Sequence, residues 1–277
     1  MRAKFKRVLK SIGHQMGMER WVKELVFQIQ KVKFYHSNRA FTKNNPGILL
    51  PADRMLFETF QLNYQKYFND GQLCAKEIIE WTLPYLNNEN LLTILDWGCG
   101  SGRVIQHMYQ FVPYSLLYGA DTNSKMLDWN TIHIKDVHFS DLNKSTKSSY
   151  PTNFFNLIYG ISVFTHLPVI EQEKWKQELT SILKPSGILL LSTQGNNFTK
   201  NLLNKEILQL KQTGHFEKAF PQKNGANGAG NRNFSSYHTY DYLLAFFSES
   251  FSILHFYDGQ LFPEKMGGQD LWLLQKK

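Results

Sequence analysis

The sequence predicts an α/β protein with a doubly wound, mostly parallel sheet of seven strands and a helical N-terminal extension. Short apolar runs alternate with segments of helical periodicity, and such runs suit strands that are buried on both faces. In addition, apolar residues recur every three or four positions over residues 4–33, which is typical of an amphipathic helix. We expect strands near residues 94–95, 116–120, 137–139, 154–159, 188–192, 251–257 and 271–274, and helices near 104–112, 197–210 and 240–247.

The first apolar run leads into a glycine-rich stretch, TILDWGCGSGRV, which begins at residue 93. Asp96 ends the strand, and Gly98, Gly100 and Gly102 follow at every second position. Glycine permits a tight turn and lets a ligand lie against the main chain. A dinucleotide-binding loop, G-x-G-x-x-G, would require glycine where this chain has Arg103. The spacing therefore favours a loop for another class of ligand, and the alternative is a turn without a ligand.

A second acidic residue follows the second apolar run. Asp121 comes 19 residues after Gly102, where a carboxylate can accept hydrogen bonds from both hydroxyls of a ribose. Asp121 also lies just before the apolar pair Met126 and Leu127, so the alternative is a residue that caps a helix. One carboxylate can fill both roles, and both stay open at this point.

The pattern D-x-G-x-G-x-G resembles motif I of the class I S-adenosylmethionine-dependent methyltransferases. The stretches SVFTHL (162–167) and LKPSG (183–187) resemble members of surface-polysaccharide and secondary-metabolite pathways, and the likeness covers about residues 70–277. The resemblance implies S-adenosylmethionine as the cofactor and an antiparallel edge formed by the last two strands. It assigns the following residues to the cofactor site: Asp96, Gly98, Cys99, Gly100, Gly102, Asp121, Thr122, Asp141, Leu142 and Ser162.

Methyl transfer to a hydroxyl needs a general base, and two histidines are candidates for it. His166 follows the fourth predicted strand and His238 precedes a predicted helix, although either can be a purely structural histidine. Tyr159-Gly160-Ile161 stands where a nucleic-acid amino-methyltransferase would carry N/D-P-P-Y/F. We therefore expect an O-methyltransferase that acts on a small molecule or a glycan. The alternatives are a protein methyltransferase and a non-catalytic binding protein with the same fold.

The composition places the chain in a broad class. Its 277 residues are 42% hydrophobic and 19% charged, which suits a globular protein with one large domain. The two cysteines, Cys74 and Cys99, are too few for a zinc site or a disulfide framework. We therefore expect no metal site and a cytoplasmic setting.

The net charge of +8 is concentrated at one end of the chain. Residues 1–43 hold eleven Lys or Arg and two Glu, so this segment alone carries +9. The nearly neutral remainder argues against a nucleic-acid partner. We expect a basic amphipathic extension over residues 1–46 and a methyltransferase domain over 47–277. The apolar face of the extension either packs on its own domain, lies on an anionic membrane or binds another partner. The sequence indicates no oligomeric state.

Overall fold

A computed structural model describes residues 19–86, 91–144, 150–219, 234–262 and 265–277. The chain divides into two compact units, Met1–Gly71 and Gln72–Lys277. This division lies later than the predicted boundary at 46/47, because residues of helix α3 (Asp53–Thr59) and of the start of α4 (Tyr64–Thr82) pack with α2 (Glu19–Asn44). Residues 1–18 of the predicted extension lie outside the described residues.

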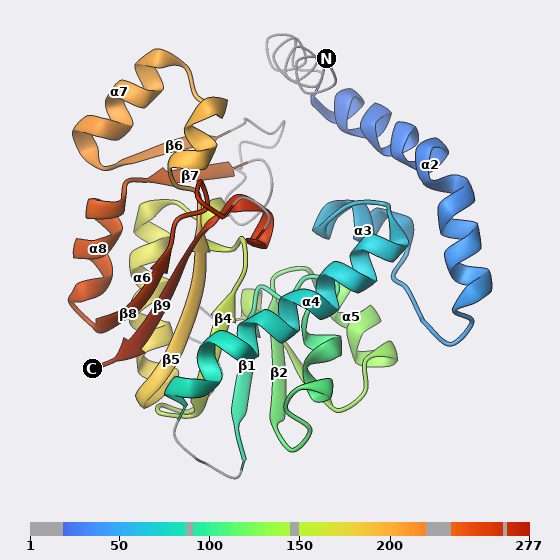
Figure 1. The fold of residues 1–277 in the computed structure, drawn as a ribbon, viewed down its shortest axis with the longest axis horizontal. Helices are drawn as coiled ribbons and strands as arrows, with labels where there is room; N and C mark the ends of the chain where they lie inside the picture. The colour runs from blue at the N-terminus through green and yellow to red at the C-terminus, as the bar shows by residue number, and fades with distance from the viewer. Residues whose placement is uncertain (1–18, 87–90, 145–149, 220–233, 263–264) are drawn as a thin grey trace. The chain divides into compact units, whose positions relative to one another are not determined.

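The second unit contains a seven-stranded sheet in the order β3-β2-β1-β4-β5-β9-β8. Figure 1 shows this sheet from β2 to β8. The five strands from β3 to β5 are parallel, and β9 runs antiparallel to both of its neighbours. This confirms the predicted fold class. The strands are β1 (Thr93–Trp97), β2 (Leu116–Asp121), β3 (Val137–Asp141), β4 (Phe155–Gly160), β5 (Leu183–Thr193), β8 (Phe251–Tyr257) and β9 (Asp270–Lys276).

Helices cover both faces of this sheet. Every residue of β1 and β4 is buried, which explains why these strands are almost continuously apolar. Ile78 and Ile79 of α4 pack on one face together with Met108. The other face is covered by α6 (Val169–Ile182) and α8 (Tyr240–Ser248), while α5 (Ser124–His133) contacts β2 and β3.

Two predicted helices differ in the structure. The segment predicted as a helix over 104–112 is the 3-10 helix η2 (Ile105–Gln110). It is rich in β-branched and aromatic residues, which are weak α-helix formers. The predicted helix over 197–210 is divided into η5 (Asn196–Asn201) and α7 (Asn204–Thr213). Glu206 accepts a hydrogen bond from the Leu203 N–H at 2.7 Å and so starts a new helix there.

A small second sheet, which the sequence did not predict, joins β6 (His215–Ala219) to β7 (Phe234–His238) in antiparallel register. Side-chain hydrogen bonds attach β7 to the segment that follows β4. The Nδ1–H of His166 donates to the Phe234 carbonyl at 2.7 Å, and the Ser236 hydroxyl donates to the Leu167 carbonyl at 2.6 Å. The hairpin is therefore fixed to the loop between β4 and α6.

The last residue of β7 completes this attachment. Gln172 of α6 donates from its amide nitrogen to the carbonyls of Phe164 and Leu167 at 3.0 and 2.9 Å. Its amide oxygen is thereby turned to His238, whose Nε2 lies 3.0 Å away. Because that oxygen can only accept, the Nε2 of His238 carries the hydrogen.

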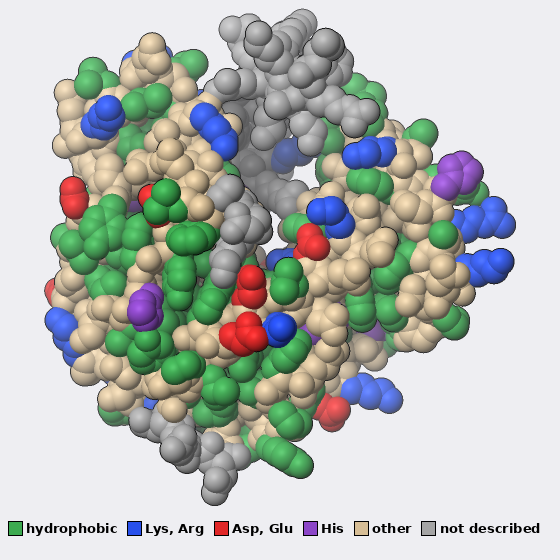
Figure 2. Space-filling model, viewed as in Figure 1, with side chains coloured by type: hydrophobic (Ala, Val, Ile, Leu, Met, Phe, Trp, Pro, Cys, Tyr) green, Lys and Arg blue, Asp and Glu red, His purple; other side chains and the backbone are tan. Residues whose placement is uncertain are grey.

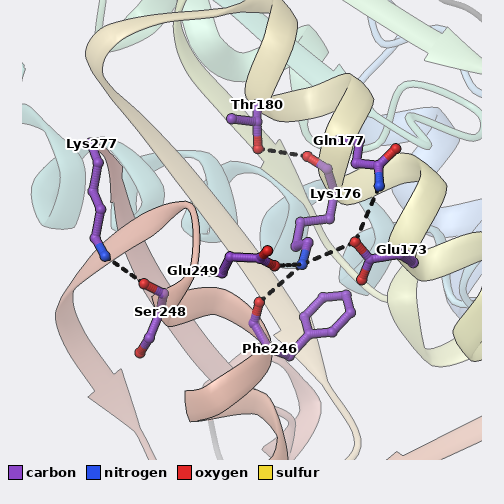
Figure 3. A network of polar contacts seen from close by, with 8 residues as sticks. All are labelled: Glu173, Lys176, Gln177, Thr180, Phe246, Ser248, Glu249 and Lys277. Carbon is purple, nitrogen blue, oxygen red and sulfur yellow. Dashed lines mark hydrogen bonds and ion pairs between the residues drawn. The ribbon is translucent and has the colours of Figure 1, made fainter.

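Helices α6 and α8 are held together by a buried cation (Figure 3). Lys176, only 4% exposed, donates to Glu249 at 2.9 Å and to the Phe246 carbonyl at 3.3 Å, and pairs with Glu173 at 3.1 Å. Its ammonium also lies 4.4 Å from the centre of the Phe246 ring. Burial lowers the pKa of Lys176, but the bonds to Glu249 and Glu173 outweigh burial, so the net shift is upward. The site thus keeps a charged lysine where helix α8 ends.

Mild acid should destabilise the protein through His238. Burial, with a contribution from the nearby His215, lowers the pKa of His238 from 6.5 to about 3. Between these values the unfolded chain binds a proton that the folded chain does not. The free energy of unfolding should therefore fall by up to ~1.4 kcal/mol per pH unit as the pH drops below the unfolded pKa.

Denaturant unfolding at pH 7 and pH 5 tests this expectation. His238→Gln keeps an N–H donor for Gln172 but cannot titrate, so this variant should lose less stability on acidification than the wild type. The matched control is His36→Gln, which replaces an exposed histidine and should keep the wild-type loss. Equal losses in His238→Gln and the wild type would show that His238 is not the responsible group.

Candidate functional site

The glycine stretch forms a loop at the carboxyl end of β1. Gly98, Gly100 and Gly102 all have positive φ, at 78°, 54° and 73°, a region that side chains other than glycine rarely adopt. A Cβ on Gly98 would lie 2.4 Å from Val163, and one on Gly102 would lie 2.2 Å from Ile134. Both conformation and space therefore require glycine in this loop.

The loop is attached to the end of the neighbouring strand β2. The N–H groups of Gly98 and Cys99 both donate to the Ala120 carbonyl, at 2.8 and 3.0 Å. A helix also supports the loop, because the buried side chain of Asn130 in α5 donates to the Gly100 carbonyl at 2.9 Å. Asn130 is a supporting residue that sequence reasoning missed, because nothing in its local pattern distinguishes it from other helix residues.

Asp121 lies where the loop meets β2. Its two carboxylate oxygens accept hydrogen bonds from the N–H groups of Gly100 and Asn123, each at 2.8 Å. The residue that caps α5 is Asn123, whose side chain accepts from Met126, so Asp121 is not the helix cap. A carboxylate offers about four lone pairs, and two of these are used. Half-buried Asp121 therefore keeps acceptor capacity for hydroxyl groups of a ligand.

The end of β3 extends the same edge of the sheet. Asp121 and Asp141 are register partners on adjacent parallel strands. Asp141 accepts from the Asn143 N–H at 2.8 Å, and the Asn143 side chain donates to the Thr122 carbonyl. Leu142 packs against the hydrophobic core. Asn143, which the sequence did not indicate, thus ties the end of β3 to the end of β2.

Two predicted cofactor residues have their side chains in the interior. Asp96 is buried, and burial raises its pKa to about 7 against the opposing effects of the Tyr159 hydroxyl and the Arg103 guanidinium. Cys99 is also buried, and burial raises the pKa of its thiol well above the usual value. Its N–H and carbonyl bond to Ala120 and Gly102 within the loop. Asp96 and Cys99 therefore shape the loop from inside the protein.

Ser162 follows β4 with a φ of 64° and belongs to a closed set of polar contacts. Its N–H donates to the Ser192 hydroxyl at 2.7 Å, and that hydroxyl donates to the side-chain oxygen Oε1 of Gln269 at 2.6 Å. The side-chain nitrogen Nε2 of Gln269 in turn donates to the Ser162 hydroxyl at 2.5 Å. Ser192 and Gln269 were not predicted, because they come from β5 and from the turn before β9. The set fixes the backbone where β4 ends.

The two candidate bases have different surroundings. His166 is half-buried in η4 (Phe164–His166), directly after Ser162 and its neighbours. Because its Nδ1 carries the hydrogen that goes to Phe234, the lone pair of the neutral ring is on Nε2. His238 is only 2% exposed and its Nε2 bonds to Gln172. That environment suits a structural role better than proton transfer with an acceptor.

The structure thus places the glycine loop, Asp121 and Asp141 along the carboxyl ends of β1, β2 and β3. The order of the sheet reverses between β1 and β4, and open α/β sheets bind ligands at such a reversal. Ser162 and His166 follow β4 on the other side of this point.

Comparison with known proteins agrees with this geometry. A family model described as a methyltransferase domain matches residues 64–239. A malonyl-[acyl-carrier protein] O-methyltransferase of Halalkalibacterium halodurans is 29% identical over 126 residues, which are 44% of this chain and 46% of that protein. The match thus spans less than half of the relative's length.

Two solved structures share the fold. An S-adenosylmethionine-dependent methyltransferase of Methanosarcina mazei has a TM-score of 0.52 at 20% identity and is matched over 71% of this chain and 96% of its own. A 1,6-didemethyltoxoflavin-N1-methyltransferase of Burkholderia thailandensis, solved with S-adenosylhomocysteine, also has a TM-score of 0.52, at 11% identity, over 83% and 92% of the two chains.

The residues at the edge of the sheet fit S-adenosylmethionine. The spare lone pairs of Asp121 match the two ribose hydroxyls, and the glycine loop exposes main chain where a side chain would otherwise stand. By its family model and its fold, the chain belongs to the methyltransferase-domain family, among the class I S-adenosylmethionine-dependent methyltransferases.

Proposed function

We propose that the protein transfers a methyl group to an oxygen atom of a small-molecule acceptor, with a glycan as the first candidate. The proposal rests on two groups at the carboxyl ends of the strands. Asp121, after β2, has acceptor capacity for a cofactor, and His166, after β4, is held in one tautomer by its bond to the Phe234 carbonyl. The partial likeness to a protein named as an O-methyltransferase supports oxygen as the accepting atom. The likeness of 162–167 and 183–187 to enzymes of surface-polysaccharide pathways supports a glycan.

The cofactor supplies an electrophilic methyl carbon when it is bound. In-line displacement at such a carbon depends on alignment and on exclusion of water, which the protein must provide. Asp121 would hold the ribose, Asp141 and the backbone of Leu142 would hold the adenine, and the loop at Gly98–Gly102 would hold the amino-acid end. The Nε2 of His166 would accept the proton of an acceptor hydroxyl.

Identification of the acceptor tests this proposal most directly. Cell extract is incubated with the protein and with S-adenosylmethionine labelled in its methyl group, and labelled products are identified by mass spectrometry. A methyl ether or methyl ester on a small molecule supports the proposal. Label on a protein or on a nitrogen atom would contradict it.

We also propose a cytoplasmic protein that contacts an anionic membrane surface through residues 1–43. The charge of +9 in this segment supports the contact, since each basic residue near such a surface contributes on the order of 1 kcal/mol. In the part of the chain that the structure describes, no helix is long and apolar enough to cross a bilayer.

Removal of the Asp121 carboxylate should weaken cofactor binding. Asp121→Ala should cost roughly 1.5–3 kcal/mol, which corresponds to a roughly 10- to 150-fold higher Kd by calorimetry. Asp121→Asn is the milder variant, since its amide oxygen can still accept from Gly100 or Asn123. Asp128→Ala removes an exposed acid from α5 and serves as the control. Unchanged affinity in a folded Asp121 variant would remove this residue from the cofactor site.

Loss of the base should lower turnover without affecting cofactor binding. His166→Asn places an amide nitrogen at the position of Nδ1, so it can still donate an N–H to the Phe234 carbonyl, but it cannot take up the proton of the substrate hydroxyl. With a hydroxyl acceptor, turnover should fall about 10²–10⁴-fold, while the calorimetric Kd for S-adenosylmethionine stays unchanged. His255→Gln, at an exposed position on β8, is the control. Full activity of His166→Asn would leave His166 with a structural role only.

A further inference from the structure

Helix α2 uses one face to build the core of the N-terminal unit. Phe27 is buried there with Leu56, Leu62 and Tyr67, and Phe34 packs against this cluster. Polar residues of the same face complete the attachment. Gln30 accepts from the Leu62 N–H at 3.0 Å, and Asn38 donates to the Leu62 carbonyl at 2.6 Å and accepts from the Tyr64 N–H at 3.0 Å. Residues 27, 30, 34 and 38 thus define the inner face of α2.

The outer face of α2 carries a stripe of large apolar side chains. Trp21, Leu25, Ile29 and Val32 follow one another at intervals of four, four and three residues. Because each residue turns an α-helix by ~100°, these four lie on the side opposite Phe27. They are 73%, 50%, 49% and 78% exposed. We call these four residues the outer stripe; neighbouring large apolar side chains in such a row are unusual on a free surface.

The surroundings of the outer stripe are basic. The exposed residues Lys33, Arg39 and Lys43 are among the six Lys or Arg of helix α2, and the ~100° rotation per residue places these three on the half of the helix that carries the stripe. Figure 2 shows basic side chains on the surface of the N-terminal unit. Pairing of two α2 helices along the stripe would bring these like charges together. An anionic lipid surface, in contrast, offers opposite charge beside an apolar layer.

We infer that the outer stripe is the surface by which the protein lies on an anionic bilayer. The inference deepens the proposed membrane contact of residues 1–43 by naming the face that enters the lipid. Trp21 suits the boundary between headgroups and acyl chains, because its ring is apolar and its indole N–H is polar. Leu25, Ile29 and Val32 bury their side chains in the acyl layer, and the exposed Lys and Arg contact the headgroups.

Co-sedimentation of the full-length protein with vesicles tests the inference. One set of vesicles is pure phosphatidylcholine, and the other includes phosphatidylglycerol at about one third. The stripe variant combines Trp21→Gln, Leu25→Gln, Ile29→Gln and Val32→Gln, which keeps the charge and the helix-forming tendency. The control variant combines Ile132→Gln and Ile170→Gln, which are 72% and 67% exposed on α5 and α6.

We expect the wild type and the control variant to bind the anionic vesicles, and the stripe variant to bind at least about tenfold more weakly. Equal binding by the stripe variant would overturn the inference while leaving a purely electrostatic contact in place. Failure of all three proteins to bind would overturn both the inference and the membrane contact. Cofactor affinity, measured by calorimetry in each variant, reports separately on the methyltransferase site.

Two further measurements test whether the outer stripe contacts a second copy of the protein or another part of the same chain. If the wild type is a dimer by light scattering and the stripe variant is a monomer, a second copy covers the stripe and the inference fails. If the stripe variant, or the single variant Val32→Gln, has a clearly lower Tm than the control variant, the stripe packs on the chain itself and the inference also fails. Unchanged mass and Tm with lost vesicle binding support it.

Discussion

The site depends on two acceptor groups at the end of β2, one on the backbone and one on a side chain. The Ala120 carbonyl receives two N–H groups from the loop after β1, and the Asp121 carboxylate receives a third. Adjacent parallel strands are not linked by a short turn at their carboxyl ends, because the chain must cross over to start the next strand. These three hydrogen bonds therefore attach the loop after β1 to β2. Positive φ at alternate glycines lets successive N–H groups point the same way. The carboxylate that orders the loop is thus the same group that we propose as the acceptor for the cofactor ribose.

The segment after β4 is organised differently, by residues that come from far along the chain. Gln269 and Ser192 fix the backbone at Ser162, and Phe234 fixes the tautomer of His166. The edge formed by the glycine loop, Asp121 and Asp141 is thus built from the consecutive strands β1, β2 and β3, whereas the segment after β4 relies on the β6–β7 sheet and on the turn before β9. Because one fold can host many functions, a change in the second set of residues can leave the first set intact.

Much of the fold was predictable, because the strands are short apolar runs with glycine or acid at their ends. The position of Asp121 at the end of a strand was predictable for the same reason. The pairing of β6 with β7 was not predictable from the sequence. Strand β7 is held by contacts with η4, which is distant in sequence, and not by a pattern of apolar residues within the strand. Asn130, Gln172 and Gln269 act through partners distant in sequence, which no local spacing reveals.

The attachment of β7 to the loop after β4 has a consequence for motion. Strand β7 and the segment 164–172 share hydrogen bonds from His166, Ser236 and His238, so neither can open while the other stays closed. They should behave as one cooperative opening unit, whose amide protons report a common free energy of opening in hydrogen exchange. Opening of that unit would also break the hydrogen bond from the Nδ1–H of His166 to the Phe234 carbonyl. The opening that allows amide exchange would therefore also free the His166 ring to change its tautomer.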